Sequence, residues 1–151
     1  MMLAVNELYG LLLVAHIVFA LLSIVNLLVM RTGGHKIAKG AELASLSQTF
    51  RPGIPWGLRN VHMIFVTGIL MIVVGGNDVS FSQLWVQTAL LSYVLAAGHL
   101  EARLVPEIGR LSRDIQQGQV PPALVGKKFI FSIDIVLGLI GIGLIAMVTQ
   151  L

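Results

Sequence analysis

The sequence predicts an all-α integral membrane protein, a four-transmembrane-helix antiparallel bundle that forms a single domain. Of its 151 residues, 56% are hydrophobic and 11% are charged, and the mean hydropathy is +0.90. A soluble domain has about 25% charged residues, so this chain has too little polar surface for a water-soluble fold. The charges are also clustered, and they leave four long runs that are uncharged apart from Asp134: 8–30, 60–77, 79–100 and 129–151. Apolar runs of about 18 or more residues are typical of transmembrane helices.

The basic residues orient the chain. All ten lie either between the first and second runs or between the third and fourth: Arg31, Lys36, Lys39, Arg51, Arg59, Arg103, Arg110, Arg113, Lys127 and Lys128. Because Lys and Arg concentrate in cytoplasmic loops, both termini are expected outside and both long loops inside. The basic pI of about 9.7 then indicates contact with the lipid bilayer and not with nucleic acid. We expect a multi-pass protein of the cell membrane, the inner membrane in a bacterium.

The domain, residues 1–151, is expected to contain spans at approximately 8–30, 56–75, 81–105 and 128–150. The second span needs residues before Asn60 to reach about 20, which places Trp56 and Arg59 at the inner interface. After the first span, His35 is expected in a loop beside Gly33 and Gly34.

The third span begins with a capping-box spacing, Ser80 followed by Gln83. It is expected to continue into the cytoplasm as a helix, because three apolar residues keep helical spacing beyond the membrane: Ile108, Leu111 and Ile115. Pro106 is expected to kink this extension, and Gly118 to end it.

The first cytoplasmic loop contains a shorter amphipathic stretch. Leu43, Leu46 and Phe50 share one side, which predicts a short helix that lies on the cytoplasmic surface of the membrane.

Polar residues inside the expected spans are the candidate functional residues, because each needs a partner in lipid. Counted at about 1.5 Å per residue from the nearest cytoplasmic base, Asn26, His62, His99 and Asp134 all lie about 5–9 Å deep. They define one polar layer in the inner leaflet, supported by two bases that flank it: Arg59 and Arg103. His16 lies nearer the outer side.

Small and polar residues recur at helical spacing on three spans, which predicts that these faces turn inward. The three stripes are Tyr9, His16 and Ser23; Thr88, Ser92, Ala96, His99 and Arg103; and Asp134, Gly138 and Gly141. An inward Asp134 is expected to be buried and to pair with one of three residues: His62, His99 or Arg103.

The polar layer has several interpretations. It either orders the bundle as interhelical contacts or forms a site for haem b, another porphyrin, a quinone or a relayed proton. The chain has no cysteine, which excludes disulfides and covalent haem attachment, and no metal cluster or catalytic constellation is visible. We therefore expect a haem- or porphyrin-associated redox or proton-handling component, with His99, His16 and His62 as the cofactor residues.

Two other functions stay open. One is a non-catalytic accessory or assembly subunit, present as a homo-oligomer or in a larger membrane complex. The other is a small ion or solute carrier.

Several short motifs resemble a family of four-helix bacterial membrane proteins. They are VAHIV at 14–18, TGILMIVVGG at 67–76, Trp85, and GHLEARLVPEIGRL at 98–111. The family is distantly similar to the copper-resistance D and HemJ-type protoporphyrinogen oxidase membrane domains. The resemblance implies haem or porphyrin at His16 and His99. The lysine that follows the third-helix tryptophan in those oxidases is absent after Trp85, so the resemblance implies the fold and not the oxidase activity.

Overall fold

The structure is a computed structural model that describes residues 2–51, 58–75 and 79–150. The described chain is helical and contains no strand. In order, the elements are α1 (Met2–Ala38), α2 (Leu43–Thr49), α4 (Asn60–Val74), α5 (Leu84–His99), the π-helical turn η1 (Leu100–Leu104), α6 (Val105–Gln116) and α7 (Ala123–Thr149).

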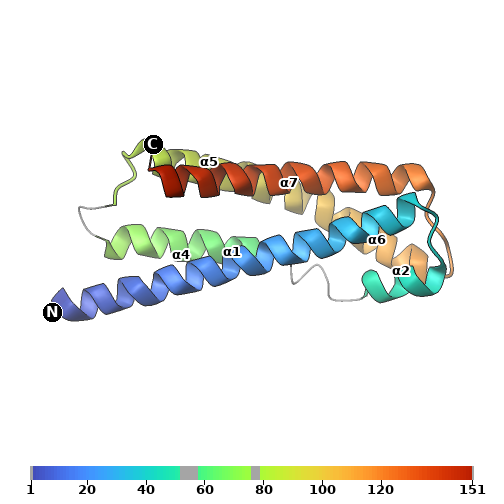
Figure 1. Cartoon of the computed structure of the whole chain (residues 1–151), viewed down its shortest axis with the longest axis horizontal. Helices are drawn as coiled ribbons and strands as arrows, with labels where there is room; N and C mark the ends of the chain where they lie inside the picture. Colours follow the sequence, from blue (N-terminus) through green and yellow to red (C-terminus); the bar gives the residue numbers. More distant parts are fainter. Residues whose placement is uncertain (1, 52–57, 76–78, 151) are drawn as a thin grey trace.

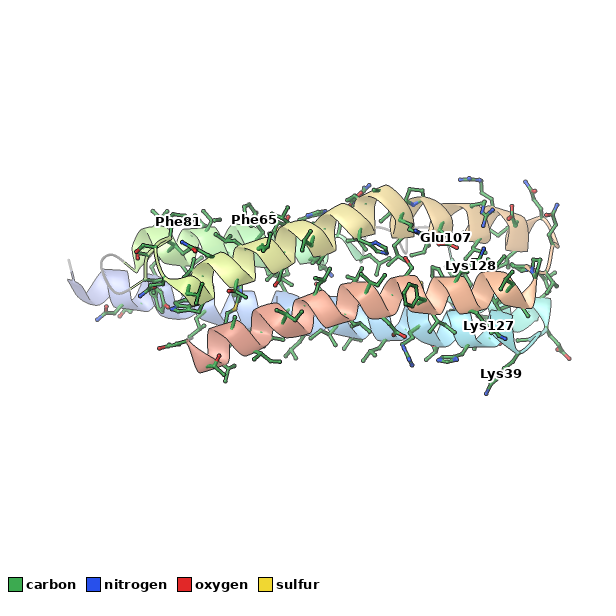
Figure 2. All side chains as sticks on the ribbon, turned by 90° about the horizontal axis from the view of Figure 1, so that it is seen from above. Lys39, Phe65, Phe81, Glu107, Lys127 and Lys128 are labelled. Carbon is green, nitrogen blue, oxygen red and sulfur yellow. The ribbon has the colours of Figure 1, made fainter. Side chains whose placement is uncertain are left out.

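The long helices run side by side as an elongated bundle (Figure 1). α1 packs against α4 and α7, and α5 packs mainly against α7. Both termini lie at one end of the bundle, together with the connection between α4 and α5. α2, α6 and the connection to α7 lie at the other end, which we call the basic end because it contains Lys39, Lys127 and Lys128 (Figure 2).

Within the described residues, two helices are long and apolar enough to cross a membrane: Asn6–Ala38 within α1, and Ala123–Thr149. Only 17% and 33% of their most apolar windows are buried, whereas the core helix of a soluble protein would be mostly buried. Their exposed side chains include Leu11 and Val148, both at least 70% exposed. Such surfaces are stable in lipid and costly in water. α4 is shorter, about 22 Å for its 15 residues, against a hydrocarbon core of about 30 Å.

The basic end has a core like that of a soluble protein. The side chains of Phe50 and Phe129 are fully buried, and their ring centroids lie 5.8 Å apart. α6 adds the three residues whose spacing predicted a cytoplasmic helix, all buried: Ile108, Leu111 and Ile115. The extension of the third helix is therefore confirmed, and Gly118 follows its end with a φ of +82°.

The short helix α2 forms as expected, but its expected position is wrong. Leu46 and Phe50 are fully buried because α2 packs against α1 and α6. The Ser112 hydroxyl also donates a hydrogen bond to the Phe50 carbonyl at 3.0 Å. The apolar side of α2 is thus covered by protein and is not available to lipid.

α1 does not end at the glycine pair after the first expected span, so the predicted loop around His35 is wrong. The helix instead uses Gly34 to cross α7 closely at Gly126. A Cβ on Gly126 would lie 2.6 Å from the Gly34 carbonyl oxygen and 2.5 Å from the Ala38 nitrogen. Glycine here permits a close approach of two helices, which outweighs its low helix propensity.

The third helix accommodates Pro106 through a wider turn. Proline has no N–H to donate, and its ring clashes with the carbonyl four residues earlier, that of Ala102. Ala102 lies within the π-helical turn η1, and widened turns of this kind are an established cause of helix bends. Residues 84–116 therefore remain helical throughout, with a change of helical register near the basic end.

Candidate functional site, a polar cluster between two helices

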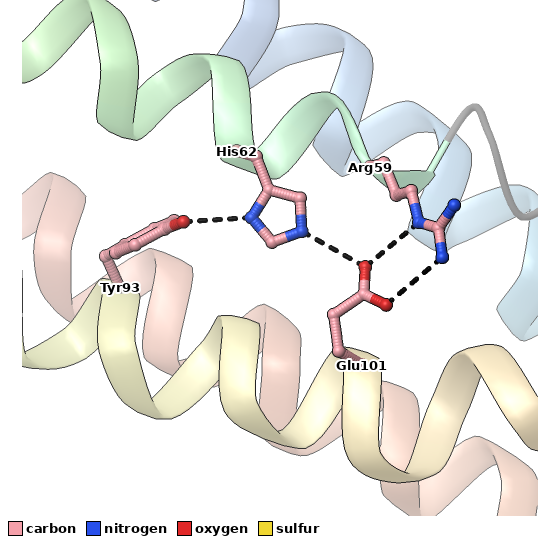
Figure 3. Close-up of polar contacts among 4 residues, drawn as sticks. All are labelled: Arg59, His62, Tyr93 and Glu101. Carbon is pink, nitrogen blue, oxygen red and sulfur yellow. Dashed lines mark hydrogen bonds and ion pairs between the residues drawn. The ribbon is translucent and has the colours of Figure 1, made fainter.

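Four side chains form a continuous hydrogen-bonded cluster between α4 and the α5–η1 segment (Figure 3). His62 Nδ1 lies 2.9 Å from the Tyr93 hydroxyl, and His62 Nε2 lies 3.1 Å from Glu101 Oε1. Arg59 donates to both oxygens of Glu101, from Nε at 3.1 Å and from Nη2 at 3.4 Å. We call Arg59, His62, Tyr93 and Glu101 the His62 cluster.

The partners of His62 define its tautomer when the ring is neutral. The Glu101 carboxylate can only accept, so Nε2–H donates to it and Nδ1 accepts from the Tyr93 hydroxyl. The Tyr93 ring stacks on Phe65 with centroids 4.5 Å apart, and it meets the His62 ring edge-on at 6.2 Å. Both ring nitrogens of His62 are therefore held in fixed directions.

This arrangement is suited to proton transfer. An imidazole between a phenol and a carboxylate receives a proton on one nitrogen and releases one from the other. The two acid–base partners of His62 lie on the facing α5–η1 segment, so the hydrogen bonds of His62 join α4 to that segment at two points. The side chains of Arg59, His62 and Glu101 are 36–41% exposed, which leaves the carboxylate end open to the surroundings.

The sequence identified Arg59 and His62 but missed their partners. Glu101 is the first acid after the charge-free run 79–100, and it lies within one turn of His99. Its depth in the expected span could therefore have identified it as a candidate partner of His62. Tyr93 lies two turns before Glu101 on the same helix, a spacing that also could have indicated a shared face.

His16 occupies a separate place, between α1 and α4. It is buried, and its Nδ1 lies 2.9 Å from the Thr67 hydroxyl. Thr67 also donates to the carbonyl oxygen of Met63 at 2.7 Å. Gly68 leaves room for the imidazole, since a Cβ there would lie 3.3 Å from His16 Cε1. The inward direction expected for the first stripe is observed, because Ser23 is buried as well.

His99 lies in a third place, against α7. Its Nε2 is 2.7 Å from the hydroxyl of Ser132, which is buried. Ser92 and Ala96 of the same stripe are also buried, whereas Arg103 is exposed. His99 and Arg103 line a cavity of about 330 Å³.

The expected surroundings of Asp134 are wrong. Its side chain is 43% exposed, and it pairs with Arg31 of α1 at 2.7 Å instead of with His62, His99 or Arg103. Arg31 Nη1 also lies 3.2 Å from His35 Nε2.

The outward direction of Asp134 follows from the way α7 packs. Ser132, Ile133, Val136 and Gly143 form its buried face, so the stripe of Asp134, Gly138 and Gly141 points away from it. Added Cβ atoms at these two glycines would meet nothing within 4 Å.

The members of the expected polar layer, and His16 outside it, are therefore divided among several helix pairs. His16, His62 and His99 each have a different hydrogen-bond partner, and no two of them are joined. Asn26 is half-buried on α1 and has an interaction of its own. Among the described residues, no group of three His, Cys, Asp or Glu side chains is placed to hold a metal ion.

Comparisons with known proteins add no assignment. No known protein family, curated protein or solved structure matches this chain.

Proposed function

We propose that the chain is a four-span membrane protein that transfers protons through the His62 cluster, with both termini outside. The membrane assignment is supported by the two long apolar helices with largely exposed side chains. The orientation is supported by the basic end, where Lys39, Lys127 and Lys128 lie together. In this orientation the His62 cluster lies near the inner boundary of the membrane.

The four-span topology is testable because the chain has no cysteine. Asn77→Cys, in the connection that follows α4 and outside the described residues, is expected to react with a membrane-impermeant maleimide in intact cells. Ser47→Cys, on the exposed side of α2, is expected to react only after the membrane is permeabilised. A cytoplasmic Asn77→Cys would contradict the proposed topology.

The observation that supports proton transfer is the double engagement of His62. One ring nitrogen meets the hydroxyl of Tyr93, a group that can donate or accept a proton. The other meets the carboxylate of Glu101, which Arg59 holds in place. Farther along α4, Thr67 forms a second buried hydrogen bond, with His16 of α1. Ionisable groups within membrane helices are typical of proton pathways.

The function is tested with the full chain in liposomes that contain a pH-sensitive dye. When a potassium gradient and valinomycin drive proton entry, we expect faster acidification than in empty liposomes. His62→Gln is expected to reduce the rate to that of empty liposomes, because a glutamine side chain keeps hydrogen bonding but cannot take up and release a proton as an imidazole does.

His35→Gln is the matched control, since His35 is an exposed histidine outside the cluster. It is expected to keep the rate of the unmodified chain. A rate for His62→Gln equal to that of the unmodified chain would contradict the proposal. An absorption spectrum of the same preparation tests haem: a Soret band would favour the cofactor expected from the resemblance.

A second candidate function is that of a subunit in a larger membrane assembly. The observation that favours it is the outward position of Gly138 and Gly141 on α7, because small residues permit close helix contacts in lipid. Gly138→Leu with Gly141→Leu is expected to convert an assembly into single chains on a native gel in mild detergent. Gly98→Leu is the control, an exposed glycine with open space on α5. Migration of the unmodified protein as a single chain would contradict this candidate.

A further inference from the structure

A basic groove lies between α5–η1 and α7. It shares the α5–η1 segment with the His62 cluster, which lies between that segment and α4. The groove has a volume of about 330 Å³, near the lower limit of ligand-binding pockets. Its polar lining consists of His99, Arg103, Lys127, Lys128 and Ser132.

The three cations of the groove have no acidic partner within the described chain. The ion pairs within 4 Å in those residues join Arg31 to Asp134 and Glu101 to Arg59 and His62. Glu107 lies at the same end of the molecule (Figure 2), but it forms no such ion pair with Arg103, Lys127 or Lys128. Three positive charges that share one groove repel one another, so an anion between them would stabilise the arrangement.

The floor of the groove provides polar hydrogen-bonding groups. His99 Nε2 and the Ser132 hydroxyl lie 2.7 Å apart, and Ser132 is buried. An ion with several acceptor oxygens can therefore meet charged donors at the rim and polar groups at the floor. Phosphate groups have this chemistry, and both Lys and Arg bind them.

The other lining residues indicate where such a phosphate would come from. Phe131 is 68% exposed, and Ile135 lies one turn farther along α7, where the apolar run of the helix continues. The groove thus changes from basic to apolar in the direction in which α7 enters the expected span. A phospholipid has the same polarity, with a phosphate at the membrane boundary and acyl chains beneath it.

We infer that the basic groove binds the phosphate of an anionic phospholipid headgroup from the inner leaflet. Arg103, Lys127 and Lys128 hold the phosphate, and Phe131 and Ile135 contact the first part of the lipid chains. Basic pockets between transmembrane helices on the cytoplasmic side are suited to such headgroups. The inference rests on the proposed membrane orientation but not on proton transfer, because it involves no residue of the His62 cluster.

The test is native mass spectrometry of the full chain, delipidated in detergent and titrated with phosphatidylglycerol. We expect one bound lipid per chain, with clear preference over phosphatidylcholine. Lys127→Gln with Lys128→Gln is expected to weaken binding about 30-fold, and Arg103→Gln alone about fivefold, from the usual contribution of a base near an anionic lipid. Arg103→Gln serves as an independent variant if the double variant fails to fold, as judged by circular dichroism.

The control is Lys39→Gln with Arg113→Gln, which removes the same charge from exposed positions outside the groove. It is expected to leave binding unchanged. Equal losses in the control and in the groove variant would show general attraction to anionic lipid and would overturn the inference. Binding of phosphatidylcholine as tight as that of phosphatidylglycerol would overturn it too. Inorganic phosphate is added as a separate arm, and a phosphate affinity equal to that of the lipid would overturn the assignment to lipid.

Discussion

Replacing Phe129 by alanine is expected to lower the free energy of unfolding by about 3–5 kcal/mol. Phe129 is fully buried in the basic end, where its ring lies against Phe50 with centroids 5.8 Å apart. Removal of the ring leaves a cavity between α1, α2 and α7 that the surrounding helices fill only in part. Thermal unfolding in detergent, followed by circular dichroism at 222 nm, measures the effect as a lower Tm.

Phe81→Ala is the control for this prediction. Phe81 is 51% exposed and lies at the opposite end of the bundle, so its loss leaves no buried cavity (Figure 2). We expect a Tm close to that of the unmodified protein. Equal shifts for the two variants would show that the basic end does not have the packed core described above.

Replacing Gly126 by alanine is expected to destabilise the protein by about 1–3 kcal/mol, and valine by more. The new Cβ would lie 2.5 Å from the Ala38 nitrogen and 2.6 Å from the Gly34 carbonyl oxygen. Both are backbone atoms, which cannot rotate away as a side chain does. The crossing of α1 and α7 must therefore widen, and the same thermal unfolding experiment measures the loss.

Gly138→Ala on the same helix is expected to change stability in the opposite direction. Its Cβ would meet nothing within 4 Å, and alanine in a helix is more favourable than glycine by about 1 kcal/mol. The pair of variants thus separates helix propensity from packing. If Gly126→Ala were neutral or stabilising, the close crossing would be wrong.

The all-helical fold and the approximate positions of the helices were predictable from the sequence, because long apolar runs and clustered charges indicate helices and their connections. The apolar face of α6 follows directly from the spacing of Ile108, Leu111 and Ile115. The continuation of α1 through Gly33 and Gly34 was not predictable in this way. Glycine pairs are local signals for a helix end. Only the close contacts of Gly34 with α7, and of Gly33 with Thr49 and Phe50, explain why glycine stands inside this helix.

The candidate site was only partly predictable, for a different reason. Depth along each helix identified Arg59 and His62, but depth does not specify which faces meet. Asp134 was expected to point inward because glycines share its face, whereas α7 uses its Ser132 face for packing. Arg31 was treated as a marker of the membrane boundary, and it is instead the partner of Asp134.

The π-helical turn η1 has a consequence for chain length. An α-helix advances by about 100° per residue. The turn at Leu100–Leu104 has the wider π-helical bonding, which holds about one residue more per turn than an α-helix does. Loss of one residue from this segment would therefore restore regular α-helical winding and leave the directions of the α5 and α6 side chains nearly unchanged. A single-residue deletion is expected to be tolerated here more readily than elsewhere in residues 84–116, because the π-helical turn already contains the extra residue.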